Sequence, residues 1–420
     1  MIRNIAGSVL FLAVGLGLSR FMFFLVFLVA SSVLSVEEFS SLSLFVLTGT
    51  FLTYIFTFGL NIGLLKHSSN IEEKSEAECL AICRFVFKVV TSGLLLVVLA
   101  AASFGLLDIL IEHNPKILGN RVRVCGLLAF VILSIHKIQY SSILTGLKNF
   151  KAIFIANTLE AVFLVPGLYS SKAIEDVLLF LCISLAVSVT YLAISTNKNV
   201  EKITLSYNAI SLKLPVIFKS CLTFYLAGLM SMAAMWTSQA VFFSSNIDLE
   251  EFAKFSFAFR VYTPFIFLFS VISTVMIPYI ADKRTMYRYE LRDFIVRPIV
   301  FIVMLGGLSA VCIYALYDQV ELHFDLKYKE LSGVLGVLIL VASAQGAVKV
   351  LVNKMIADLD SSGNLIGELL FSITLLCSFF IVWYYEKLSA MQFSLIILTA
   401  YLVSGIGYSK ILQVKYKTIK

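Results

Sequence analysis

The sequence predicts an all-α polytopic membrane protein with about 12 transmembrane helices in two parallel-repeat six-helix bundles around a central cavity, both termini cytoplasmic. Three observations predict this fold class: the composition, the length of the apolar blocks and a phrase that recurs halfway along the chain. Hydrophobic residues make up 60% of the 420 residues and charged residues only 14%, whereas soluble domains carry about 25% charge. The composition therefore excludes an ordinary soluble globule.

The apolar residues form blocks that are long enough to cross hydrocarbon, which takes about 20 helical residues. Two of them, Ser40–Leu65 and Ser220–Ser245, contain no charge at all. We expect helices at residues 5–32, 40–65, 80–106, 121–144, 150–170, 176–196, 214–243, 252–281, 293–317, 331–356, 363–385 and 389–412. The first is too long for a cleaved signal peptide and another span follows almost at once.

Basic residues mark one side of the membrane. Most of the 33 Lys and Arg residues fall in alternate connections and in the C-terminal tail, while the other connections are acidic or mixed. Basic loops stay in the cytoplasm, so both termini are predicted to be cytoplasmic. An even number of spans agrees with this orientation.

The recurring phrase is VEEFSSLSLF at Val36–Phe45 and LEEFAKFSFAF at Leu249–Phe259. These stretches follow spans 1 and 7, and both lie on the predicted extracytoplasmic side. Six spans per half place the halves in the membrane the same way round, as parallel repeats. We therefore expect an N-terminal six-helix bundle at 1–196, a cytoplasmic linker at 197–213 and a C-terminal six-helix bundle at 214–420. The alternative is a chance match, because Glu is common in the first turn of helices.

Two such bundles suit alternating access around a site near the midplane. The chain has no Walker-type glycine-rich loop for ATP, and no extracytoplasmic connection is long enough for a catalytic domain. We expect a transporter rather than an enzyme, without a cofactor and without nucleic acid as a partner. The seven cysteines are expected to be small core residues, because Cys79 and Cys83 lack the further ligands of a zinc site. No metal site is therefore predicted.

Several short motifs resemble those of Wzx-type polysaccharide flippases of the multidrug/oligosaccharidyl-lipid/polysaccharide (MOP) exporter superfamily. Leu34–Ser40 is similar to the family's Leu-Gly-x-Glu-x-Phe-Gly entry to span 2, with Ser40 in place of the usual Gly. The other matching positions, spread over nearly the whole chain, are Phe58-Gly59-Leu60, Gly146-Leu147 with Phe150, Ser256–Arg260 and Pro278.

The resemblance implies export of a lipid-linked oligosaccharide, typically an undecaprenyl-pyrophosphate repeat unit, from the cytoplasmic to the outer leaflet. It implies a multi-pass protein of the bacterial inner membrane that serves O-antigen, lipopolysaccharide, capsule or other surface polysaccharide biosynthesis. It implies a polysaccharide polymerase and a chain-length regulator as partners. Membrane lipid and a coupling proton or sodium ion are further expected partners.

Four cations lie within the predicted spans, where ionisable residues usually face a cavity or a partner. They are Arg20, Lys137, Lys349 and Arg260, two from each half. Arg and Lys are the side chains that bind phosphate oxygens, so we expect these four to bind the pyrophosphate. The alternatives are that Lys137 and Lys349 extend to the cytoplasmic interface, and that the arginines form structural pairs.

The clearest intramembrane acid is Glu160, with Asn157 one turn earlier. A carboxyl group in low dielectric tends to hold a proton, so this pair is a candidate for ion coupling. A salt bridge from Glu160 to Lys137 is the alternative. Glu368, Asp358 and Asp360 are expected to be solvated charges at helix ends.

Three prolines are expected to kink their helices, because proline lacks the backbone N–H group. Pro166 interrupts span 5, and Pro264 and Pro278 lie in span 8; all three are hinge candidates.

Two rival functions remain open. One is a MATE-like drug/cation antiporter, whose cavity should carry acids, and the other is a membrane-embedded polysaccharide-assembly enzyme.

Overall fold

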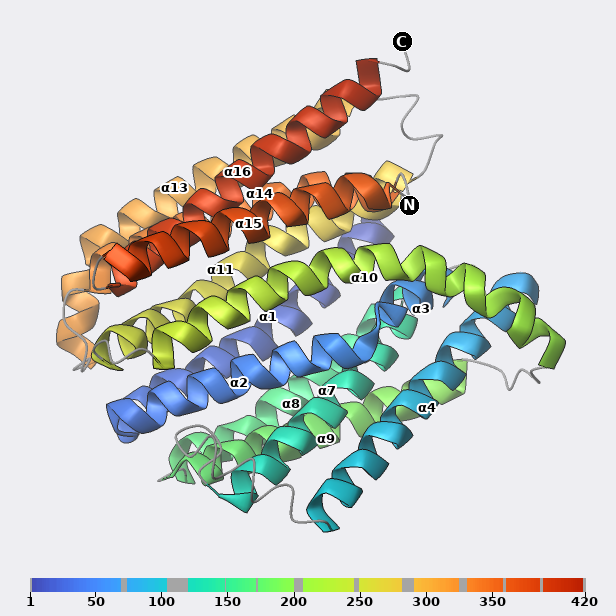
Figure 1. Ribbon diagram of the computed structural model, residues 1–420, viewed down its shortest axis with the longest axis horizontal. Coiled ribbons are helices and arrows are strands. Elements are labelled where there is room, and N and C mark those ends of the chain that lie inside the picture. The colour runs from blue at the N-terminus through green and yellow to red at the C-terminus, as the bar shows by residue number, and fades with distance from the viewer. Residues whose placement is uncertain are drawn as a thin grey trace. The chain divides into compact units, whose positions relative to one another are not determined.

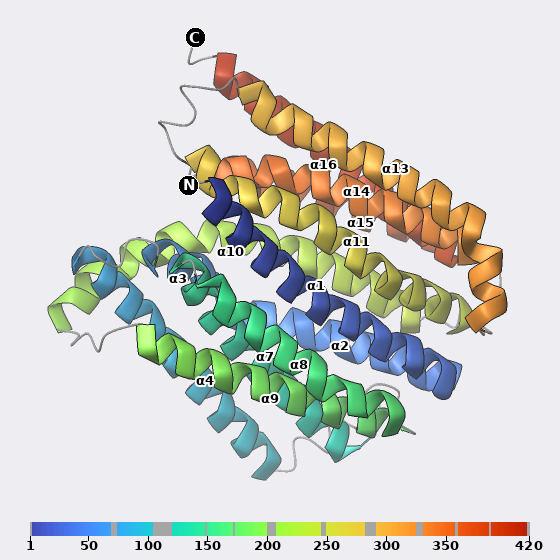
Figure 2. The ribbon, with the colours of Figure 1, turned by 180° about the vertical axis from the view of Figure 1, so that it is seen from behind.

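The computed structural model contains only helices among the residues that it describes (Figures 1 and 2). These residues are 2–68, 74–103, 120–147, 149–170, 173–199, 207–244, 249–281, 291–324, 331–357, 360–385 and 388–417. The side chains of some residues inside these helices are not described, those of Arg20, Pro166 and Pro278 among them.

All twelve predicted spans are helical in their described parts, and the second is broken in two. The helices are α1 (Ile2–Val33), α2 (Val36–Thr57), α3 (Leu60–Ser68), α4 (Lys74–Ser103), α7 (Arg121–Gly146), α8 (Phe150–Ser170), α9 (Ile174–Asn199), α10 (Tyr207–Ser244), α11 (Leu249–Ala281), α13 (Leu291–Phe324), α14 (Leu331–Ala357), α15 (Ser361–Tyr385) and α16 (Ala390–Lys417). Within the described segments, nine helices combine the length and the hydropathy needed to cross a bilayer. The predicted all-α polytopic fold is confirmed.

The chain divides into two compact units. Unit 1 comprises Met1–Leu34 and Ser41–Tyr225, and unit 2 comprises Ser35–Ser40 and Leu226–Lys420, so that α10 contributes to both. Within unit 1, α9 packs against α7 and α8, and within unit 2, α16 packs against α14 and α15. These helices occupy corresponding places in the two predicted halves, so the packing repeats as the sequence does.

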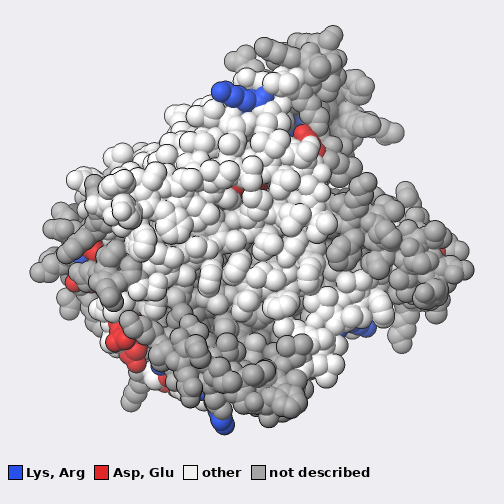
Figure 3. Space-filling view, in the orientation of Figure 1, with Lys and Arg blue, Asp and Glu red and all other residues white. Residues whose placement is uncertain are grey.

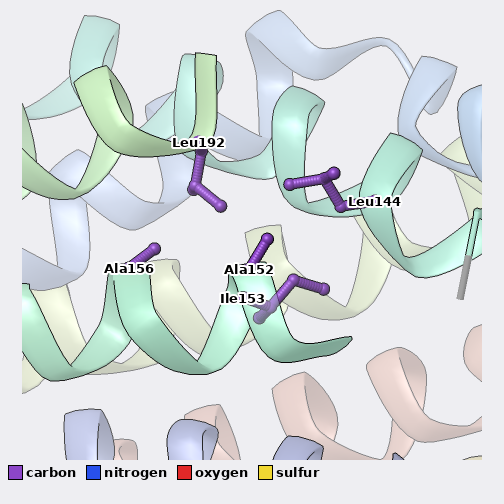
Figure 4. Close-up of a cluster of buried hydrophobic side chains, with 5 residues drawn as sticks. All are labelled: Leu144, Ala152, Ile153, Ala156 and Leu192. Carbon is purple, nitrogen blue, oxygen red and sulfur yellow. The ribbon is translucent and has the colours of Figure 1, made fainter. Parts of the chain in front are cut away.

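The core of unit 1 contains a contact between three helices at their predicted cytoplasmic ends. Small residues of α8, Ala152 and Ala156, lie near Leu144 of α7 and Leu192 of α9, and Ile153 of α8 completes the cluster (Figure 4). All five are at least 94% buried. Because α8 presents alanines here, its two neighbours can approach its backbone closely. On another side, α8 packs along α1.

The core of unit 2 is built around α14, which packs against α11, α13 and α16. Glycines allow the close approach of two of these neighbours. A Cβ atom at Gly306 of α13 would lie 2.3 Å from the Ser343 side chain, and one at Gly346 would lie 2.5 Å from Phe269. Ser343 also donates a hydrogen bond of 3.2 Å to the Ile302 carbonyl. Small residues and hydroxyl–carbonyl bonds are the usual means of joining helices in membranes.

The recurring phrase begins a helix in both places, but its second glutamate accepts hydrogen bonds from different groups in the two places. Glu38 accepts hydrogen bonds from the backbone and side chain of Ser35, in a capping box at the start of α2. Glu251 instead accepts a hydrogen bond of 2.8 Å from the backbone N–H of Ala390, at the start of α16. The following phenylalanines, Phe39 and Phe252, are both buried. The repeat therefore preserves the helix entry and its buried aromatic ring.

The Phe-Gly-Leu motif is the place where span 2 breaks. Phe58 and Gly59 have φ values of 48° and 68°, in the left-handed region that ends a helix. Gly146 ends α7 beside α3, where a Cβ atom would lie 1.9 Å from the Ser68 hydroxyl. Two of the motifs behind the family resemblance are thus positions where the backbone or its neighbour requires glycine.

The outer surface agrees with a bilayer environment. Figure 3 shows a broad face of mostly uncharged residues, with most of the described charges toward its margins. Large apolar side chains are exposed along α13, among them Phe301, Met304, Leu308 and Val311. Such exposure would be costly in water and is expected where lipid chains cover the protein.

Candidate functional site

The structure places the four predicted cations in different settings. Arg20 lies in α1, and its side chain is outside the described residues. Arg260 is partly buried in α11, two residues before the buried Tyr262, and Lys349 is exposed on α14. Arg20 and Arg260 belong to different units, so a phosphate site formed by both remains a prediction.

Lys137 is not a free cation. Its ammonium group donates to a carboxylate oxygen of Glu160, which joins α7 to α8 within unit 1. The two side chains are 23% and 9% exposed. Lys137 therefore does not extend to the interface, and the salt bridge that the sequence left as an alternative is present.

Asn157 lies on α8 one turn before Glu160 and is 2% exposed. Its side-chain nitrogen has no hydrogen-bond partner among the described residues. The structure thus leaves a buried amide donor close to the ion pair along the helix. It does not test the role in ion coupling predicted for Asn157 and Glu160.

The expectation of a solvated helix-end charge was wrong for Glu368. This residue lies about two turns into α15 and is partly buried, and both of its carboxylate oxygens have partners. Ser231 of α10 donates to one oxygen, and Tyr408 of α16 lies 3.2 Å from the other. The sequence could not show the Ser231 contact, because α10 is several spans away from α15 in the chain. Asp360 does cap a helix end, where it accepts from the Gly363 N–H at 3.1 Å, whereas Asp358 lies outside the described residues.

The surroundings of Glu368 are rich in oxygen and short of hydrogen-bond donors. We call this group of residues the Glu368 site; it comprises Ser231, Asn364, Glu368 and Tyr408. The single hydroxyl hydrogen of Tyr408 faces three acceptors: the backbone and side-chain oxygens of Asn364, both at 3.1 Å, and Glu368. Among the described residues, no Lys or Arg forms an ion pair with Glu368. A carboxylate among hydroxyl and carbonyl oxygens offers the ligands that hard cations prefer.

Glycine at position 367 allows Tyr408 to reach this site. A Cβ atom on Gly367 would lie 2.1 Å from the Tyr408 ring, which is fully buried. Ser404, one turn before Tyr408, donates to the Gly367 carbonyl at 3.1 Å. The α15–α16 contact thus sets the position of the tyrosine hydroxyl.

We expect Gly367→Ala to displace the Tyr408 ring and to destabilise unit 2 by about 1–3 kcal/mol, the usual cost of overpacking a core. The measurement is the free energy of unfolding in detergent micelles. The matched control is Gly307→Ala on α13, where an added Cβ atom meets nothing within 4 Å. Equal stability of the two variants would contradict the close packing of Tyr408 on Gly367.

A signal for Glu368 does exist in the sequence, in the repeat itself. Span 5 carries Asn157 and Glu160, and span 11, its counterpart in the second half, carries Asn364 and Glu368. Both pairs place an amide about one helical turn before an acid. The two acids nevertheless have different partners, a lysine in unit 1 and hydroxyl groups in unit 2.

The hinge candidates are only partly described. Pro264 lies inside α11, which runs through it as one helix from Leu249 to Ala281. Proline cannot donate to the carbonyl four residues earlier, which belongs to Arg260. The side chains of Pro166 in α8 and Pro278 in α11 lie outside the described residues, so these hinges stay predictions.

Comparison with known proteins identifies the fold. No family model matches the chain, and no curated protein matches it by sequence. Solved structures match over nearly the full length of both chains. An inward-facing multidrug resistance MATE family transporter of the MOP superfamily has a TM-score of 0.68 at 15% identity, covering 96% of this chain and 99% of that one.

Two further structures agree. An outward-facing MATE transporter of the same superfamily has a TM-score of 0.71 at 15% identity, with coverage of 98% and 96%. A MATE protein in the bent conformation has a TM-score of 0.71 at 14% identity, with coverage of 99% and 97%. The chain therefore has the fold of these MATE structures.

Proposed function

We propose that this protein is a cation-coupled exporter that works by alternating access, with the Glu368 site as its coupling site. The observation that supports this most is the asymmetry between the two acids. Glu160 has a permanent counter-ion in Lys137. Glu368 has only hydroxyl partners among the described residues, so its charge can be balanced by a cation that comes and goes.

This asymmetry moves the proposed coupling role from Glu160 to Glu368. A proton exchanging at Glu160 would have to leave Lys137 with a partly buried, uncompensated charge, which is unfavourable. At Glu368, binding of a proton or a sodium ion would neutralise a carboxylate in a low-dielectric setting, which is favourable. Downhill entry of that cation can then drive the export of a substrate through the same protein.

For the cargo, a MATE-type drug/cation antiporter is the first candidate. Its support is the fold shared with multidrug resistance MATE transporters over nearly the whole chain. The pairing of Lys137 also removes one of the four cations on which the expectation of an anionic substrate depended. Organic cations are therefore the first cargo class to test.

A lipid-linked oligosaccharide is the second candidate, and Arg260 favours it. This arginine stands in the Ser-x-Ala-x-Arg motif of α11, partly buried between the ends of its helix. A guanidinium in such a place can form paired hydrogen bonds with a pyrophosphate. In that case the protein would serve surface polysaccharide biosynthesis in a bacterial inner membrane, with a polymerase and a chain-length regulator as neighbours.

The test is transport by the full chain in liposomes. One set contains a fluorescent organic cation, and the other a short-chain polyprenyl-pyrophosphate oligosaccharide whose appearance in the opposite leaflet is followed. Each set is run with a proton gradient, a sodium gradient or neither. Arg260→Ala is compared with Arg123→Ala, whose side chain pairs with Glu175 at the predicted outer end of α7.

Gradient-driven movement of the organic cation, unaffected by Arg260→Ala, would establish the antiporter. Movement of the lipid-linked sugar that is lost in Arg260→Ala and kept in Arg123→Ala would establish the flippase. Transport of either cargo at equal rates with and without both gradients would contradict cation coupling.

A further inference from the structure

A strained break interrupts the second span. Phe58 adopts a φ of 48°, a left-handed conformation that is costly for a residue with a bulky side chain. Gly59 follows at 68°, and the chain then re-enters a helix as α3. Such outliers persist only where surrounding contacts hold them, and they often mark elements that switch.

Tyr225 of α10 holds this break. Its hydroxyl donates a hydrogen bond of 3.0 Å to the carbonyl of Ile55, in the last turn of α2. Its ring lies parallel to that of Tyr54 with centroids 5.8 Å apart, and 5.9 Å from the ring of Phe58. The Ile55 carbonyl also accepts a long backbone hydrogen bond of 3.4 Å from Phe58. The tyrosine hydroxyl therefore satisfies a group that the broken helix leaves poorly bonded.

The same helix also reaches the Glu368 site. Ser231 lies six residues after Tyr225 on α10 and donates to the Glu368 carboxylate. Tyr225 is the last residue of unit 1, and Ser231 belongs to unit 2. Both residues belong to α10, which is one helix from Tyr207 to Ser244. One continuous helix therefore carries a contact to the break in unit 1 and a contact to the acid in unit 2.

We propose that α10 is a mechanical link that transmits the state of the Glu368 site to the Phe58–Gly59 break. With Glu368 ionised, the Ser231 contact fixes α10, and Tyr225 holds the break. A cation bound at Glu368 competes with the Ser231 hydroxyl for the carboxylate. Loss of that contact frees α10, Tyr225 leaves the Ile55 carbonyl, and the strained turn relaxes. The role of cation binding at Glu368 as the trigger rests on the proposed function. The mechanical link through α10 does not depend on it.

The test is hydrogen exchange of the full-length protein in lipid nanodiscs, read at the backbone amides of residues 58–62. Tyr225→Phe keeps the ring and removes the hydrogen bond, and we expect exchange about fivefold faster, because a net hydrogen bond is lost. Ser231→Ala should produce a similar increase, although residue 231 lies in the other unit. The matched control is Ser238→Ala, whose hydroxyl bonds to the Ala234 carbonyl of its own helix; its exchange at 58–62 should equal that of wild type.

Unchanged exchange in Tyr225→Phe would show that Tyr225 does not hold the break. An increase in Tyr225→Phe but not in Ser231→Ala would show a local contact without a link through α10. Cation binding is measured separately on the same samples. Its readout is the change in hydrogen exchange at the backbone amide of Glu368 when sodium or protons are added. Faster exchange at the break in Ser231→Ala, without any cation effect at Glu368, would support the link and contradict the proposed coupling site.

Discussion

Glu368→Gln is expected to abolish the dependence of transport on the cation gradient while the protein remains folded. Glutamine has nearly the shape of glutamate and can still accept a hydrogen bond from Ser231 or Tyr408, but it carries no charge to bind a cation. A hydrogen bond or contact to a charged group is worth about 1.5–3 kcal/mol. We therefore expect the affinity for the driving cation to fall by roughly 100-fold.

The measurement compares transport with and without each gradient for wild type and Glu368→Gln. Glu251→Gln is the matched control, because Glu251 is also a partly buried acid of unit 2 that accepts a hydrogen bond from a helix start. It should keep the response to the gradient. A Glu368→Gln protein that retains the wild-type response would exclude the Glu368 site as the coupling site.

Lys137→Met is expected to destabilise the protein by about 3 kcal/mol, because it leaves the Glu160 carboxylate buried without its counter-ion. Adding Glu160→Gln should restore most of this loss, since the double variant has no unpaired charge. The measurement is a double-mutant cycle on the free energy of unfolding in detergent micelles. Such cycles isolate the energy of a pair when each change removes only that interaction.

Lys254→Met is the control for this cycle. Lys254 pairs with Glu250 and Glu251 at the start of α11, and these two acids are 51% and 26% exposed, against 9% for Glu160. Ion pairs with exposed members contribute about 0–1 kcal/mol. If the cycle gives no coupling energy between positions 137 and 160, the result contradicts a structural ion pair. A folded double variant that no longer responds to the cation gradient would instead support the coupling role predicted for Glu160.

Comparing Glu160 with Glu368 shows which contacts could be inferred from the sequence. The sequence already allowed a salt bridge between Lys137 and Glu160 as an alternative, because the two residues lie on consecutive spans joined by a short turn. Two helices so joined must lie antiparallel, and residues equally far from the turn then meet. Of the partners of Glu368, Tyr408 lies on the next helix, α16, and follows from the same rule, whereas Ser231 lies on α10, several spans earlier in the chain. No local pattern could have identified Ser231 as its neighbour.

The sequence by itself determined that the chain crosses the membrane many times, where most helices begin and end to within a few residues, and that its two halves repeat. These properties are local, because hydrocarbon requires long apolar helices and their polar connections are short. Only the tertiary structure decided that span 2 breaks at Phe58, that one acid is neutralised by lysine and that the other faces hydroxyl groups. Those outcomes depend on which helices pack together, and in a membrane that choice depends on small residues and buried hydrogen bonds rather than on hydrophobicity.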